Sequence, residues 1–176
     1  MRYFFIVVLV MAGQGMWSKE AVAGEVAALN PPTGTILHRR LIDNPGQHYF
    51  LYIPRRGGAQ APVFVTVHGI SRNASEHVRM FMPYAERYGV VLVAPYFPQS
   101  RFPDYQRLGR VGRGQRADVM LDKIVQDVAR LTHAQTDKLY LFGYSGGAQF
   151  VHHYALAYPA RVARLVVRQT SPRSVN

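Results

Sequence analysis

The stretch of sequence that decides the fold is Lys138-Leu139-Tyr140-Leu141-Phe142-Gly143-Tyr144-Ser145-Gly146-Gly147. Residues 138–142 have the apolar character of a buried strand, and residues 146–158 have helical character up to a proline. A Gly-x-Ser-x-Gly pattern between a strand and a helix predicts a nucleophile elbow, which lifts the serine hydroxyl above the sheet. Gly143, Tyr144 and Gly147 are expected to support this turn. Small residues two positions before and two positions after Ser145 let the strand and the helix approach closely.

The helix expected to begin at Gly146 adds an electrostatic feature to this turn. Its first N–H groups have no partner within the helix, and its dipole is positive at this end. Both features would stabilise the oxyanion that forms when Ser145 attacks a carbonyl group. The N–H of Gly146 is therefore the first predicted oxyanion donor, while a glycine-rich turn with a structural serine is the alternative interpretation.

The remaining sequence alternates between strand-like and helix-like segments. Asn44-Pro45-Gly46 predicts a turn between the first two strands, and Pro83 predicts a kink or the start of a second helix. Residues 95–115 are rich in glycine and proline and are expected to form a long loop. Strands are expected at 35–42, 48–53, 63–67, 90–94 and 162–167, and helices at 74–88 and 116–133. This alternation predicts an α/β fold with a mainly parallel sheet and flanking helices.

A second motif, His68-Gly69-Ile70, directly follows the apolar strand at 63–67. With both motifs in this order, the chain resembles the α/β-hydrolase family over residues 35–167, and within it secreted esterases and polyester depolymerases. The resemblance implies that the N–H of Ile70 is the second oxyanion donor and that Gly69 supplies backbone freedom. It also implies that His68 is a packed, hydrogen-bonded structural residue.

The family order of the catalytic triad is Ser, then Asp or Glu, then His. Residues 146–176 contain no Asp or Glu, and their histidines are His152 and His153. Because these two lie on the helix that leads away from Ser145, we expect them to be packing or surface residues. The sequence is therefore interpreted as a partial α/β-hydrolase fold that lacks the last strand–helix units, as a truncated hydrolase would.

Asp118 begins the long helix before the elbow strand, at a position where such enzymes often carry an aspartate. A favourable interaction with the helix dipole, or a capping role, is sufficient to explain it. The last expected strand, at 162–167, would leave a bare apolar sheet edge, which favours aggregation.

These motifs predict a serine hydrolase that cleaves carboxylic ester bonds through Ser145 and an acyl-enzyme. Its activity is expected to be impaired, because the triad acid and His are missing. The substrate would be a small-molecule or polymeric ester, and the mechanism requires neither a cofactor nor a metal. The alternative is a non-catalytic, secreted, basic binding protein on a hydrolase scaffold.

The chain of 176 residues carries 21 Lys and Arg against 10 Asp and Glu, a formal net charge of +11. Such a charge can attract nucleic acid or anionic surfaces, but the arginines are scattered and resemble no nucleic-acid-binding module. We therefore expect a basic surface and no nucleic-acid partner. The absence of cysteine excludes disulfides, a Cys nucleophile and Cys-ligated metal.

The loop glycines Gly109, Gly112 and Gly114 do not have the spacing of a dinucleotide-binding fingerprint, so nucleotide binding is disfavoured. The loop is expected to be flexible and to lie near the rim of the active site. Its positive charge would there favour anionic substrates, and it comes from Arg107, Arg110, Arg113 and Arg116.

The N-terminal residues have the layout of a secretory signal peptide. Arg2 is followed by the apolar run at 3–12 and by Ala21-Val22-Ala23, which suits cleavage after Ala23. Residues 1–23 are thus predicted to be a signal peptide, residues 24–34 a leader, and residues 35–176 the partial hydrolase domain. The protein would be exported to the periplasm or the medium, without a stable membrane span. The alternative interpretation of the N-terminal apolar run is a buried first strand or an uncleaved membrane anchor.

Overall fold

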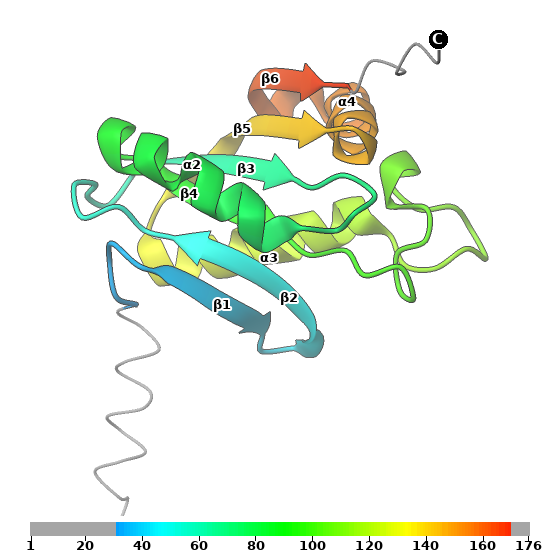
Figure 1. Ribbon diagram of the computed structural model, residues 1–176, viewed down its shortest axis with the longest axis horizontal. Helices are drawn as coiled ribbons and strands as arrows, with labels where there is room; N and C mark the ends of the chain where they lie inside the picture. Colours follow the sequence, from blue (N-terminus) through cyan, green and yellow to red (C-terminus); the bar gives the residue numbers. More distant parts are fainter. Residues whose placement is uncertain (1–30, 170–176) are drawn as a thin grey trace, which may run out of the picture.

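The computed structural model describes residues 31–169. Within them, six strands form one sheet in the order β1-β2-β4-β3-β5-β6 (Figure 1). β4, β3, β5 and β6 are parallel to one another, while β2 is antiparallel to both β1 and β4. The expected α/β fold with a mainly parallel sheet is therefore confirmed. The strands are β1 Ile36–Leu41, β2 Asn44–Tyr52, β3 Pro62–Val67, β4 Val91–Pro95, β5 Gln135–Tyr144 and β6 Val162–Arg168.

In the described part of the chain, three α-helices flank this sheet, with α2 on one face and α3 and α4 on the other (Figure 1). Alternate residues of the strands serve the two faces, as the pleat requires. Val63, Val65 and Leu141 pack toward α3 and α4, whereas Leu92 and Ala94 pack toward α2. The helices are α2 Ala74–Tyr88, α3 Ala117–Thr132 and α4 Gly146–Ala157, and two short 3₁₀ helices are η1 Tyr105–Arg107 and η2 Pro159–Arg161.

The turn between β1 and β2 does not lie at Asn44-Pro45-Gly46, where the sequence predicts it. β2 begins at Asn44, which pairs with Leu41, so the chain turns at Ile42 and Asp43 and not at residues 44–46. A register shift after Arg40 accommodates the extra residues of β2, Pro45 among them. Such a bulge tolerates proline because the missing N–H is not needed there for the ladder.

Pro83 lies inside α2, so of the two alternatives expected at this residue, a kink or the start of a second helix, the second is wrong. Val78 and Ala85 are buried on either side of the proline. Their packing against the sheet provides stabilisation that offsets the lost backbone hydrogen bond.

The glycine-rich segment at 95–115 is anchored more firmly than a flexible loop would be. Its aromatic residues Phe97, Phe102 and Tyr105 are fully buried, and Tyr105 begins η1. Sequence patterns gave no helical or strand period for these anchors, because they are spaced irregularly among turn residues.

The predicted signal peptide, residues 1–23, and most of the predicted leader, residues 24–34, lie outside the described residues. In the part of the chain that the structure describes, no helix combines the length and the apolar character needed to cross a membrane.

Candidate active site

Ser145 occupies the junction between β5 and α4 in an unusual backbone conformation. Its φ is 52° and its ψ is −114°, and residues other than glycine rarely adopt a positive φ. Conformations of this kind cost about 1–3 kcal/mol and persist where the surroundings impose them. Here the N–H of Ser145 donates to the carbonyl of Arg168 at 2.8 Å, and its carbonyl accepts from the N–H of Ala148 at 3.0 Å.

The glycines around Ser145 are required by close backbone contacts. A Cβ placed on Gly147 would lie 2.1 Å from the carbonyl oxygen of Val67 and 2.5 Å from that of His68. One placed on Gly143 would lie 2.2 Å from the carbonyl oxygen of Gly147. Any side chain at either position would therefore push α4 away from β3 and β5.

The loop after β3 lies directly against this turn. Val67 of β3 is paired with Gly143 of β5, so the two motifs follow the carboxyl ends of neighbouring parallel strands. A Cβ placed on Gly69 would be 3.4 Å from the Cβ of Ser145. Similarly, a Cβ placed on Gly146 would be 3.1 Å from the Cγ2 of Ile70. The fold thus brings Gly69, Ile70 and Gly146 together around Ser145.

His68 holds the adjoining loop in place from inside the core. It is fully buried, its Nε2 accepts the N–H of Phe97 at 3.1 Å, and its Nδ1 donates to the carbonyl of Gly69 at 2.8 Å. Burial lowers the pKa of His68 to about 4, although the bond to Gly69 acts in the opposite direction. The imidazole is therefore neutral at pH 7, which confirms the expected packed, hydrogen-bonded histidine.

Tyr105 forms a wall of the site that the sequence analysis missed. Its hydroxyl donates to the carbonyl of His68 at 3.0 Å and would be 2.6 Å from a Cβ on Gly146. Burial raises the pKa of Tyr105 to about 12, so this hydroxyl stays protonated and donates. Gln106, next in the chain, places its Cγ 3.2 Å from the same Gly146 position.

Arg72 ties this wall to the loop after β3. Its guanidinium donates to the carbonyls of Phe97 and Phe102 and lies 5.0 Å from the centre of the Tyr105 ring. A guanidinium over an aromatic face adds a cation–π attraction to these bonds. The presence of several aromatic residues in a segment rich in glycine and proline was the available signal for this wall, but it does not predict which residues they contact.

Asp118 lies away from Ser145, in a buried cluster at the start of α3. It pairs with Arg116 and accepts the hydroxyl of Tyr158 at 2.6 Å. Burial by itself would raise the pKa of Asp118, but hydrogen bonds from Arg116, Tyr158 and the N–H of Val119 outweigh it and lower the pKa. Its role is structural, since it joins α3 to the end of α4.

His152 and His153 are exposed on α4, as expected for surface residues. The Nδ1 of His153 donates to the carbonyl of Gln106 at 2.8 Å, which ties α4 to η1. Of the loop arginines, Arg110 pairs with Asp104 at 2.7 Å.

Three further histidines form hydrogen bonds elsewhere in the structure. His77 is hydrogen-bonded to Thr66 Oγ1 at 2.8 Å in the core, and His38 and His48 are bonded to each other at 3.0 Å. Within residues 31–169, no imidazole and no carboxylate is hydrogen-bonded to Ser145 Oγ. The site therefore combines a serine with nearby backbone N–H groups, but these residues do not hold a base against it.

Comparisons with known proteins agree with the fold described above. Feruloyl esterase B from Talaromyces funiculosus is 26% identical over 122 residues, which make up 66% of this chain and 35% of that protein. Acetyl xylan esterase from Aspergillus awamori superposes with a TM-score of 0.64 at 20% identity, over 78% of this chain and 53% of that structure. Poly(3-hydroxybutyrate) depolymerase from Bordetella parapertussis gives a TM-score of 0.63 at 24% identity, over 79% and 53%.

The chain has the α/β-hydrolase fold. It spans about half the length of these solved structures and about a third of the feruloyl esterase, so the fold is partial. No protein-family model matches the sequence.

Proposed function

We propose that this chain carries the nucleophile and the oxyanion hole of a serine hydrolase that cleaves carboxylic ester bonds. The observation that carries the proposal is the positive φ of Ser145 between β5 and α4, the strained turn that a nucleophile elbow requires. A serine with a merely structural role has little reason to retain such a conformation.

In the proposed reaction, Ser145 Oγ attacks the ester carbonyl, the alcohol leaves, and water hydrolyses the resulting acyl-enzyme. The N–H groups of Gly146 and Ile70 would stabilise the oxyanion, with Gly69 allowing the loop to approach. Two facts support this assignment. Gly146 is the first residue of α4, where an N–H has no intrahelical acceptor, and Ile70 lies beside it.

The ester class is supported by the relatives. Feruloyl esterase, acetyl xylan esterase and poly(3-hydroxybutyrate) depolymerase are named for carboxylic ester substrates that include polymers. We infer a small-molecule or polymeric ester as the substrate. Export is inferred from residues 1–23, which lie outside the described part of the chain.

We further infer that these 176 residues hydrolyse esters slowly by themselves. Ester cleavage needs a base that takes the Ser145 proton and returns it to the leaving alcohol. Loss of the triad His costs about 10⁶ in kcat in a comparable serine enzyme, and the oxyanion hole and binding retain about 10³–10⁴ over water.

Labelling with a fluorophosphonate, followed by intact mass, tests the nucleophile. We expect slow addition of one label, faster when imidazole is added as an external base. Ser145→Ala should abolish the labelling, whereas Ser71→Ala, a serine of the neighbouring loop, should label like the parent. Labelling that survives Ser145→Ala would refute the assignment.

A second candidate is the non-catalytic basic binding protein. It is favoured by the net charge of +11 and by the lack of a base at Ser145 within residues 31–169. A chain that stays unlabelled even with imidazole would support it. Conversely, rapid hydrolysis of a p-nitrophenyl ester, abolished by Ser145→Ala, would show that the chain is a complete enzyme and that the inferred impairment is wrong.

A further inference from the structure

Two histidines of the first hairpin bring ring nitrogens together on one face of the sheet. The Nε2 of His38 on β1 lies 3.0 Å from the Nδ1 of His48 on β2. In the antiparallel register His38 is opposite Phe50 and His48 is opposite Arg40, so the two imidazoles are diagonal neighbours. We call them the histidine pair. β1 and β2 lie at the end of the sheet opposite β6, and both strands are described along their whole length.

The side chains around the histidine pair restrain its geometry. The ring of His38 stacks on the ring of Phe50, with 4.7 Å between the ring centres and 11° between the planes. His48 is half-buried, whereas His38 is exposed. Both imidazoles line a pocket of about 350 Å³, whose other walls include Phe50, Arg72, Ser75 and Tyr96. The two nitrogens therefore meet in a restrained arrangement at a position that solvent reaches.

Both inner nitrogens of the pair can present a lone pair to the same point. In the hydrogen bond between two neutral imidazoles, one inner nitrogen carries the proton and the other accepts it. If that proton moves to the outer nitrogen of its own ring, both inner nitrogens are free, and no proton is gained or lost. A neutral imidazole with a free nitrogen is the commonest metal ligand in proteins. The pair thus has the form of a chelating site.

We propose that the histidine pair binds a copper(II) ion. With metal–nitrogen bonds of about 2.0 Å, the separation of 3.0 Å corresponds to an N–metal–N angle of about 97°. This angle is close to the value of about 90° between neighbouring ligands of a square-planar copper site. A tetrahedral zinc site would hold the two nitrogens about 3.3 Å apart. Copper(II) also binds a given set of nitrogen ligands more tightly than the other divalent first-row metals.

The protein would supply two of the ligands to this ion. Within residues 31–169, no group of three or more His, Cys, Asp or Glu side chains could hold a metal. The remaining coordination positions would therefore be taken by water or by a small anion from the pocket beside the pair. The positive charge of Arg72 on the pocket wall favours an anion there.

Two other interpretations of the pair are distinguishable from copper binding. Calcium and magnesium prefer oxygen ligands, many of them carboxylates, whereas the pair is neutral and the charges of Arg40 and Arg101 act on His48. A hydrogen bond that serves only to join β1 to β2 would explain the contact without a metal. Only a chelating pair binds copper(II) at one ion per chain.

The test uses the full 176-residue chain without a histidine tag, and copper(II) chloride in a weakly coordinating buffer at neutral pH. We expect isothermal titration calorimetry to show one tight site per chain. Electron paramagnetic resonance of the complex should show hyperfine splitting from two imidazole nitrogens. Because the unfolded chain does not hold the two rings together, bound copper(II) should also raise the unfolding temperature. None of these readouts depends on Ser145.

Variants at single histidines locate the site. His38→Gln and His48→Gln should each weaken copper(II) binding at least about tenfold, because each leaves one imidazole of the pair. His152→Gln is the matched control, since His152 is also exposed and its ring centre lies 5.9 Å from that of His153. We expect this variant to change the affinity less than about twofold. Circular dichroism checks that each variant is folded.

Three results would overturn the proposal. The first is copper(II) binding that His38→Gln and His152→Gln weaken equally, because this would indicate adventitious binding to surface histidines. The second is no copper(II) binding at micromolar concentrations, which would leave the pair as a hydrogen bond between two strands. The third is tighter binding of zinc(II) than of copper(II) at the pair, which would contradict the square-planar geometry.

Discussion

Gly147 is the residue at which α4 and β3 come closest. Because backbone carbonyls of Val67 and His68 surround the position of a Cβ, no flexible side chain can move aside to make room. The elbow therefore requires a glycine at position 147.

Gly147→Ala should accordingly lower the free energy of unfolding by at least about 2 kcal/mol, since overpacking against backbone forces α4 to shift. Urea denaturation followed by circular dichroism measures this loss. Gly58→Ala is the matched control, because a Cβ on Gly58 meets nothing within 4 Å. We expect Gly58→Ala to stay within about 0.5 kcal/mol of the parent, and an equal effect of the two substitutions would contradict the argument.

His68 should make stability depend on pH. Its pKa is lowered from 6.5 to about 4 in the fold, chiefly by burial, so the unfolded chain binds more protons between these values. The contribution is fully present above pH 6.5 and is lost as the pH falls toward 4. Over that window we expect a loss of roughly 3 kcal/mol, measured as unfolding free energies at several pH values.

His68→Gln isolates this contribution, because a glutamine oxygen can accept the N–H of Phe97 without titrating. The variant should lose stability less steeply between pH 6.5 and 4 than the parent. His152→Gln, on the exposed face of α4, should leave the pH dependence unchanged. Identical pH profiles for the parent and His68→Gln would show that other groups, such as the buried His77, govern acid sensitivity.

Among the elements, β6 is the strand whose surroundings matter most for solubility. It lies at the end of the sheet in the described residues, next to β5, and Val167 on it is 46% exposed. An open strand edge with apolar side chains favours pairing with other chains. Arg164 and Arg168 give this edge some protection, since charges oppose edge-to-edge pairing.

Val167→Lys should therefore slow aggregation several-fold, because it adds a charge at an exposed apolar position of the edge strand. Light scattering at constant temperature and concentration measures the rate. Val111→Lys provides the comparison, because Val111 is fully exposed but lies in the loop and not on a strand. If both substitutions slow aggregation equally, net charge and not the β6 edge is responsible.

The loop at 95–115 illustrates the limit of sequence patterns at the scale of an element. Its glycines and prolines correctly excluded regular strands, but its buried aromatics carry no period. Phe97, Phe102 and Tyr105 reach the core because Arg72 and His68, distant in sequence, bind the backbone between them. Contacts of this kind are decided by the packing of several elements together.

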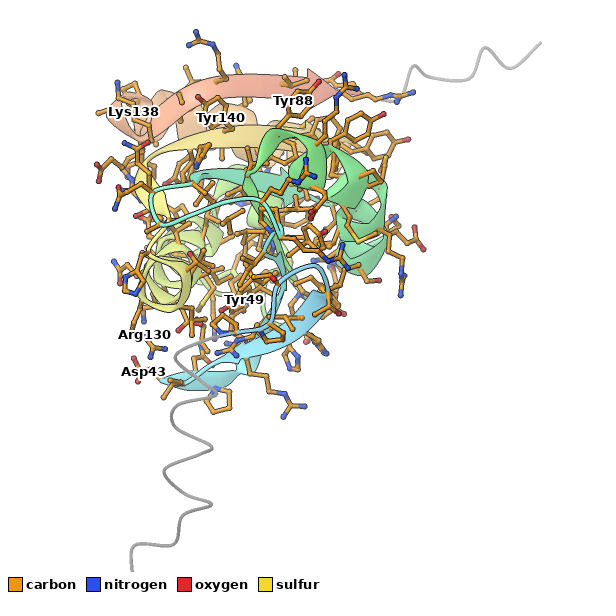
Figure 2. The ribbon with its side chains drawn as sticks, turned by 90° about the vertical axis from the view of Figure 1, so that its left-hand side faces the viewer. Asp43, Tyr49, Tyr88, Arg130, Lys138 and Tyr140 are labelled. Atoms are coloured by element: carbon orange, nitrogen blue, oxygen red, sulfur yellow. The ribbon has the colours of Figure 1, made fainter. Side chains whose placement is uncertain are left out.

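At the scale of the whole molecule, α3 is joined to its neighbours by three aspartate–tyrosine pairs. Tyr154 donates to Asp122 at 2.8 Å and Tyr158 to Asp118 at 2.6 Å, which link α3 to α4. Tyr49 of β2 donates to Asp127, which also pairs with Arg130 (Figure 2 marks Tyr49 and Arg130). The carboxylates of one helix thus hold together elements from both halves of the described chain.

Tyr49→Phe should cost about 1.5–3 kcal/mol, because it removes a charge-assisted hydrogen bond to a buried carboxylate. The free energy of unfolding in urea is the measurement. Tyr88→Phe, at a tyrosine that is 66% exposed, should stay within about 0.5 kcal/mol of the parent. A Tyr49→Phe variant as stable as Tyr88→Phe would mean that Arg130 alone satisfies Asp127.

The sequence by itself determined the class of the fold, the elements around Ser145 and the order of the two glycine motifs. These features are local. Each depends on residues within about one strand–turn–helix unit: the pattern of apolar residues, the positions of proline and glycine, and the Gly-x-Ser-x-Gly spacing. The sequence also predicted correctly that His68 is packed and that His152 and His153 are surface residues.

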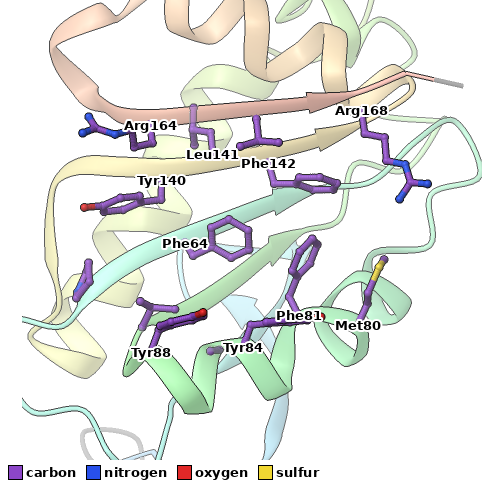
Figure 3. Close-up of a pocket in the computed structure, with 14 residues that line it drawn as sticks. Phe64, Met80, Phe81, Tyr84, Tyr88, Tyr140, Leu141, Phe142, Arg164 and Arg168 are labelled. Carbon is purple, nitrogen blue, oxygen red and sulfur yellow. The ribbon is translucent and has the colours of Figure 1, made fainter.

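Only the tertiary structure decided which residues meet at the site and which face of the sheet stays open. Ile70 reaches Gly146 because β3 and β5 are neighbours in the sheet, although the two residues are 76 positions apart in the chain. Tyr105 and Arg72 meet because the segments that carry them follow β4 and β3, which are also neighbours in the sheet. The groove between α2 and strands β3, β5 and β6 (Figure 3) likewise follows from where the helices pack, since apolar side chains such as Tyr84 and Tyr88 stay exposed when nothing in the described chain covers them.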